Sequence, residues 1–167
     1  VGQVGLGRLL GLVQAEQVAA LVEQRGLRRV QVLGGIVGQG AAVFKFSDGK
    51  AVTANSFKYA INRVANHDLA SPGAQFITDP TGTNIVGAKA VNDGQGTNVS
   101  GVKVKGNRLT INLTQADGTF MAKITMPFFQ ATSTKLPLTK EVVNVTKTNL
   151  PSAGPYYMVR NDPDRLT

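Results

Sequence analysis

The stretch FSDGKAVTANSFKYAINR, residues 46–63, decides how this chain folds. Its first part, residues 47–50, combines Ser, Asp and Gly and predicts a tight turn with Gly49 at a positive φ. Thr53 then stands where an N-cap residue is expected, and we predict a helix from there to about Ala65. Apolar residues recur at helical spacing, which predicts one buried and one exposed face. The residues predicted to face the core are Phe57, Ala60, Ile61 and Val64, and those predicted to face solvent are Lys58, Asn62 and Arg63.

Downstream of this helix the sequence predicts a β-hairpin. Apolar residues recur along residues 99–104 and 109–114, and the Lys-Gly-Asn-Arg sequence between them predicts a turn with Gly106 at a positive φ. We also predict a short helix near residues 85–91, a second one capped by Asp117, and a final strand at residues 156–159. This mixture of helices and strands indicates an α+β domain over residues 44–167.

Residues 1–43 differ in composition from the rest of the chain. They contain only eight residue types, and every aromatic residue and every lysine lies after them. Leu and Val recur at nearly helical spacing over residues 10–22 and predict a helix, whereas residues 29–32 alternate and predict a strand. We interpret residues 1–43 as a divergent or foreign segment of unclear origin, and residues 44–167 as a separate domain.

A glycine-rich turn at Gly5, Gly7 and Gly11 imitates a dinucleotide-binding motif. In that motif glycines let the backbone amides at a helix start approach a pyrophosphate. Here the spacing is one residue too long for G-x-G-x-x-G, and the following strand ends at residues 33–35 without an acidic residue. We therefore expect no bound cofactor, and a dinucleotide-binding enzyme fragment remains a remote alternative.

Composition excludes several classes of site. The chain has no cysteine and a single histidine, His67, so it offers neither a thiolate nor a multi-histidine metal site. His67 lies in a polar loop, where a solvated side chain is expected rather than a catalytic base. No apolar run approaches the roughly 18 residues needed to cross a bilayer. Near the C-terminus, Asp162 and Asp164 are typical of solvated turns. We therefore expect a protein that is not an enzyme and that holds no metal.

The net charge of +8 arises from 18 basic and 10 acidic residues. Apart from the adjacent Arg28 and Arg29, the densest basic cluster is Lys103, Lys105 and Arg108 at the predicted hairpin. The other basic residues are dispersed, which does not favour specific nucleic-acid binding. An interaction domain whose basic hairpin meets an acidic partner or nucleic acid remains an open alternative.

Residues 46–63 resemble the pattern F-S-D-G-x-P-V-T-A-x-D-F-x-Y-A-x-x-R of family 5 extracellular solute-binding proteins. These are the oligopeptide, dipeptide and nickel receptors of ABC importers. Later features follow in the same order, including residues 70–72 (ASP), 87–90 (GAKA) and 151–157 (PSAGPYY). Two positions depart from the pattern, because Ala51 replaces its Pro and Ser56 its second Asp. The resemblance covers residues 44–167 only.

This resemblance implies both a fold and a function. The matching stretch corresponds largely to the smaller inserted subdomain of the first of two lobes that enclose peptide in such receptors. The whole receptor, a lipoprotein, would bind an oligopeptide or another small solute and deliver it to an ABC permease. It would do so at the extracellular or periplasmic face of a bacterial envelope.

We expect this chain to be a fragment or a processed form of such a receptor, because it begins at Val1 and represents one lobe only. A cleft needs two walls to bury most of a ligand's surface. The chain is therefore expected to lack a complete ligand cleft by itself. The candidates for ligand contact are Tyr156 and Tyr157, on the predicted final strand.

Overall fold

The structure is a computed structural model that describes residues 18–21, 29–34, 44–143, 145, 149–154, 156, 158–159, 161–162 and 165–166. Its helices are α1 (Ala54–Ala65), α2 (Gln75–Thr78), α3 (Ala88–Asn92) and α4 (Phe120–Ile124), with 3-10 turns η1 (Pro72–Ala74) and η2 (Pro127–Phe129). Its strands are β1 (Val18–Leu21), β2 (Arg29–Gly34), β3 (Val102–Lys105), β4 (Arg108–Asn112), β5 (Asn161–Asp162) and β6 (Arg165–Leu166). This mixture of helices and a small sheet agrees with the predicted α+β class.

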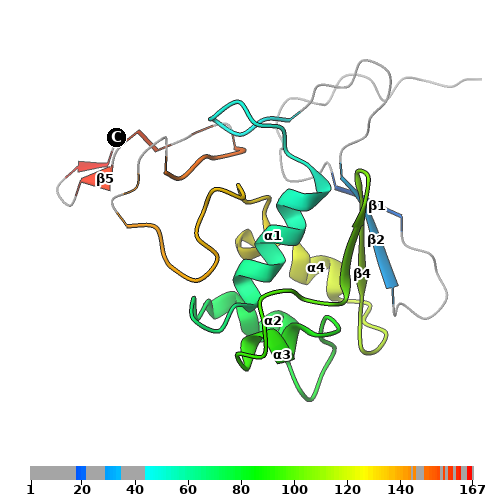
Figure 1. The fold of residues 1–167 in the computed structure, drawn as a ribbon. Coiled ribbons are helices and arrows are strands. Elements are labelled where there is room, and N and C mark those ends of the chain that lie inside the picture. The colour runs from blue at the N-terminus through cyan, green and yellow to red at the C-terminus, as the bar shows by residue number, and fades with distance from the viewer. Residues whose placement is uncertain are drawn as a thin grey trace, which may run out of the picture.

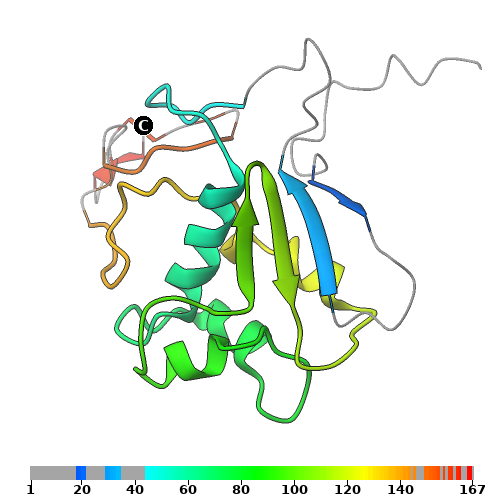
Figure 2. The same ribbon diagram turned by 45° about the vertical axis from the view of Figure 1, so that its right-hand side comes forward.

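Four of the strands form one antiparallel sheet in the order β1-β2-β4-β3 (Figure 2). The predicted hairpin is confirmed, because β3 and β4 pair from Val102 opposite Ile111 to Lys105 opposite Arg108. Gly106 in its turn has φ +57°, as predicted. The other side of β4 pairs with β2, which confirms the strand predicted at residues 29–32. The strand β2 therefore belongs to the same sheet as the hairpin.

The helix predicted over residues 10–22 is wrong at Val18–Leu21, which form β1 and pair with β2. A short apolar run does not distinguish a helix from a strand by its periodicity alone, and here pairing with β2 decides the outcome. The glycines Gly5, Gly7 and Gly11 lie outside the described residues.

The helix α1 lies against one face of the sheet, with α2 and α3 near its C-terminal end (Figure 1). It begins after Thr53 and ends at Ala65, as predicted. The backbone N–H of Thr53 donates to Ser56 Oγ at 3.2 Å, and that of Ala54 donates to Asn107 Oδ1 in the hairpin turn at 3.2 Å. These two oxygens accept hydrogen bonds from backbone N–H groups that have no acceptor within the helix. The second bond also joins the hairpin to α1. The core around α1 and the sheet includes Ile61, Val64, Ile77, Ile85, Val99, Val102, Leu109, Ile111 and Phe120.

Three backbone segments cross closely beside this core. The N–H of Gly101 donates to Val86 O at 2.7 Å, Val86 N–H to Asn112 O at 2.9 Å, and Asn112 N–H to Gly101 O at 2.9 Å. A Cβ added at Gly101 would lie 2.6 Å from Val86 O and 3.0 Å from Asn112 O. Glycine is therefore required at residue 101 by the close approach of three segments.

Two predictions for the second half of the chain need correction. The N-cap of α4 is Thr119 rather than Asp117, although Asp117 Oδ1 accepts from Thr119 N–H at 2.8 Å. No strand is present at Tyr156, Met158 or Val159, and the nearest strands are β5 and β6. Pro155 has no N–H to donate to a strand ladder, so four apolar residues next to it are a weak strand signal.

Candidate functional site

The FSDG sequence forms the turn that its composition predicts. Phe46 is buried, and its N–H donates to Lys50 O at 2.8 Å, while Gly49 N–H donates to Phe46 O at 2.8 Å. Gly49 has φ +83°, which glycine adopts without a steric penalty. The side chain of Asp48 turns back on the loop and accepts from Lys50 N–H at 3.1 Å.

Two later segments of the chain converge on this turn. Ser47 N–H donates to Ser152 O at 2.7 Å, and Ser152 N–H donates to Ser47 Oγ at 3.1 Å. Lys135 Nζ lies 2.8 Å from Asp48 Oδ2. The hydrogen bond from Lys135 lowers the pKa of Asp48 below its usual value, against the opposing effect of burial. The turn therefore joins parts of the chain that lie far apart in sequence.

Residues 132–140, which we name the strap, are bound by α1. Tyr59 Oη donates to Leu136 O, and Thr132 N–H donates to Ser56 O. Arg63 donates from Nε to Pro137 O and from Nη2 to Lys140 O, each at 2.9 Å. Two of the guanidinium's nitrogens thus hold backbone carbonyls of the same protein, so Arg63 positions the strap.

The prediction that Asn62 faces solvent is wrong, since the residue is only 9% exposed. Its Oδ1 accepts from Val99 N–H at 2.9 Å, and its Nδ2 donates to Asn98 Oδ1 at 3.4 Å. The side chain therefore partners a buried backbone donor just before the hairpin, which helical periodicity alone does not reveal.

A pocket of about 270 Å³ lies between α1, the loop after it and the strap, and it opens widely to solvent. Small-molecule sites usually occupy about 300–1,000 Å³ and enclose most of the ligand. This pocket is below that range and could not bury a peptide. Its lining residues are Arg63, Leu69, Ser71, Pro72, Leu136, Glu141, Val142 and Leu150.

Tyr156, one of the two candidates for ligand contact, is not among the residues that line this pocket. Tyr156 is 85% exposed, and Tyr157 lies outside the described residues. His67 is exposed on a loop, where its Nδ1 lies 2.8 Å from Asn92 O. Within the described part of the chain, no three His, Cys, Asp or Glu side chains gather as a metal site.

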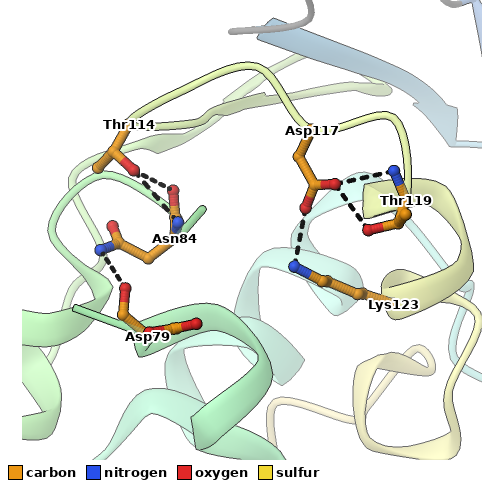
Figure 3. A network of polar contacts seen from close by, with 6 residues as sticks. All are labelled: Asp79, Asn84, Thr114, Asp117, Thr119 and Lys123. Atoms are coloured by element: carbon orange, nitrogen blue, oxygen red, sulfur yellow. Dashed lines mark hydrogen bonds and ion pairs between the residues drawn. The ribbon is translucent and has the colours of Figure 1, made fainter. Parts of the chain in front are cut away.

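Two clusters of polar side chains hold loop segments in place (Figure 3). The first joins the loop after α2 to the segment after β4, and the second lies at the start of α4. Asn84 N–H donates to Thr114 Oγ1 at 3.2 Å, and Asn84 Nδ2 donates to Asp79 O at 3.1 Å. In the second cluster, Asp117 accepts from Thr119 and lies 2.8 Å from Lys123 Nζ. These bonds join loop segments of the same chain to one another, so the clusters stabilise loops.

Acid is expected to remove the contribution of Asp117 to stability. Burial alone would raise its pKa, but hydrogen bonds from Lys123 and Thr119 outweigh that effect and lower the pKa from 3.8 to about 2. A carboxylate with a lowered pKa stabilises the folded state above its unfolded pKa, and the stabilisation is lost as the pH falls through the folded pKa. We expect Asp117→Asn to lower the free energy of unfolding by about 1–2 kcal/mol at neutral pH.

Denaturant titrations of both proteins at several pH values measure this effect. The difference between them should shrink as the pH falls from about 4 to about 2. Asp93→Asn is the control, because Asp93 pairs with Lys89 at the surface and is 46% exposed. A pH-independent difference for Asp117→Asn would contradict the assignment.

No helix in the described ranges is long and apolar enough to span a membrane. Residues 44–167 match the family described as bacterial extracellular solute-binding proteins, family 5, middle region. That match spans about three quarters of the chain. The chain belongs to this family. The resemblance inferred from the FSDG stretch is thereby confirmed over the same residues.

Solved structures of family 5 proteins share the fold of this family member. The Escherichia coli murein tripeptide binding protein MppA has a TM-score of 0.64 and 24% identity, over 84% of this chain and 26% of MppA. The pheromone receptor PrgZ has a TM-score of 0.66 and 18% identity, over 86% of this chain and 26% of PrgZ. OppA of Burkholderia pseudomallei has a TM-score of 0.63 and 18% identity, over 82% and 25%. Among curated proteins, none matches the chain.

This family 5 chain spans about a quarter of the length of those solved structures. The alignments cover more of the chain than residues 44–167 contain, so they include part of residues 1–43. The pairing of β2 with β4 agrees with that extension of the likeness.

Proposed function

We propose that this chain is part of the solute-binding protein of a peptide-importing ABC transporter. The observation that carries the proposal is the family 5 match over residues 44–167. The fold likeness to MppA and OppA supports it. The whole protein would capture an oligopeptide or another small solute at the extracellular or periplasmic face of the envelope. It would deliver this ligand to an ABC permease without catalysing a reaction.

Within that receptor, we propose that residues 44–167 form the inserted subdomain of the first lobe. This subdomain would support the lobe without binding the peptide itself. The residues of the FSDG stretch support this role, because Ser47, Asp48 and Arg63 contact other segments of the same chain. The size of the pocket beside Arg63 also supports it. A complete cleft would then need walls that this chain does not supply.

Tyr156 and Tyr157 remain the candidates for ligand contact in the whole receptor. Tyr156 is 85% exposed, so its ring is available to a ligand or to another part of the receptor. Replacing both with alanine in the whole receptor and measuring peptide affinity tests this assignment.

Calorimetry on the 167-residue chain tests the proposed role. With a mixed oligopeptide pool we expect no saturable heat at micromolar peptide, because a one-sided surface leaves most of the ligand hydrated. Cooperative thermal unfolding of the same sample establishes that the chain is folded. Saturable micromolar peptide binding would contradict the absence of a complete cleft. Tight binding of NADH would favour the dinucleotide-binding alternative instead.

A further inference from the structure

The four-stranded sheet is charged with one sign only. Its strands β1 to β4 contain four basic residues and no aspartate or glutamate. Three of the basic residues, Lys103, Lys105 and Arg108, lie on the β3–β4 hairpin, and we name these three the basic hairpin face. Lys105 pairs directly with Arg108, and Lys103 follows two positions along β3.

The three side chains of the basic hairpin face point away from the core. On β3 they alternate with Val102, which is buried, and Val104, which is partly buried against the core. All three are exposed. The helix α1 lies against one side of the sheet (Figure 2), and its residues Ile61 and Val64 belong to the same core cluster as Val102. The three cations therefore lie on the face of the sheet opposite to the core, beside Thr110, which pairs with Lys103 and is buried.

No acidic side chain among the described residues neutralises this face. The ion pairs of the described residues use Lys89, Lys123 and Lys135 instead. The sequence between Asp93 and Asp117 contains no acidic residue at all. The hairpin is also held rigidly, because β4 pairs with β2 and Asn107 accepts from Ala54 N–H at 3.2 Å.

The chemistry around these charges favours one class of partner. The exposed large apolar residues of the described chain all lie outside the hairpin. Tight protein interfaces rely on buried aromatic or apolar anchors. Single-stranded nucleic acids stack on aromatic rings. The hairpin offers neither exposed apolar anchors nor aromatic rings. A group of exposed cations without such anchors suits a surface that attracts it through negative charge alone, such as an anionic bilayer.

We propose that the basic hairpin face binds the surface of an anionic lipid bilayer. This role goes beyond solute capture and does not depend on it. In whichever protein carries the chain, the contact would orient the sheet face toward the membrane. Because the attraction is between exposed charges, it weakens as salt screens it.

Vesicle cosedimentation of the 167-residue chain tests the proposal. The chain should bind vesicles of phosphatidylcholine mixed with phosphatidylglycerol, release them at high salt, and leave pure phosphatidylcholine vesicles unbound. Each basic residue near such a surface contributes about fivefold to partitioning, so the triple variant K103Q/K105Q/R108Q should lose about a hundredfold. The matched control is K45Q/K50Q/K140Q, which removes the same charge from exposed lysines elsewhere.

Three outcomes would overturn the proposal. The first is equal loss of binding in both triple variants, which would mean that net charge alone attracts the vesicles. The second is equal binding to both vesicle types, or no binding to either. The third is binding to duplex DNA but not to vesicles, lost only in the hairpin variant, which would assign the face to nucleic acid. Thermal unfolding of both variants checks that each is folded.

Discussion

Replacing Gly101 with alanine is expected to lower the free energy of unfolding by about 2–3 kcal/mol. The new methyl group would lie 2.6 Å from Val86 O and 2.9 Å from Val86 Cβ, and neither a backbone carbonyl nor a Cβ can swing aside. Relief requires the segments around residues 86, 101 and 112 to separate. That movement would stretch hydrogen bonds that join them at 2.7 to 2.9 Å.

Urea titration of the variant and of the unaltered chain measures this loss. Gly118→Ala is the matched control, because a Cβ at residue 118 meets nothing within 4 Å and the residue has no positive φ. We expect the control to change stability by less than about 0.5 kcal/mol. Equal effects of the two substitutions would show that the crossing is not as tight as described.

Replacing Asn62 with alanine is expected to lower the free energy of unfolding by about 2 kcal/mol. The sequence pattern alone places this residue on the solvent-exposed face of the helix. The loss arises because the N–H of Val99, a fully buried residue, would be left without the Asn62 Oδ1 that accepts from it at 2.9 Å. Alanine favours the helix itself, so helix propensity would oppose the loss.

Denaturant titration gives the size of the effect, and amide hydrogen exchange identifies its cause. The Val99 amide should exchange faster in the variant than in the unaltered chain, relative to amides in the middle of α1. Lys58→Ala serves as the control, because Lys58 lies on the same helix and is only partly buried. Unchanged exchange at Val99 would contradict the assigned hydrogen bond.

Local signals predict the elements that depend on local physics. The FSDG turn, the start of α1 at Thr53 and the β3–β4 hairpin follow from turn residues, a capping residue and alternation, and all three are confirmed. The conformation of residues 18–21 depends on their pairing with β2, so the helical spacing of their apolar residues predicts the wrong element. The burial of Asn62 likewise depends on Val99, which lies 37 residues away.

The same division applies to the candidate site. The order of residues identifies the family, but it does not reveal that Asp48 pairs with Lys135 or that Arg63 holds the strap. Those contacts join residues about 75 to 90 positions apart, and composition carries no information about them. The division of the chain at residue 43 and the ligand role of Tyr156 and Tyr157 stay predictions.

An exchange with MppA tests most directly whether residues 44–167 support a receptor lobe without gripping peptide. The corresponding part of the Escherichia coli protein is replaced by residues 44–167 of this chain, and murein tripeptide binding is measured by calorimetry. If this unit only supports the lobe, a chimera that unfolds cooperatively should keep the tripeptide affinity of MppA within about tenfold, or 1.4 kcal/mol. A cooperatively folded chimera that loses the tripeptide, or prefers another peptide, would show that these residues grip the ligand.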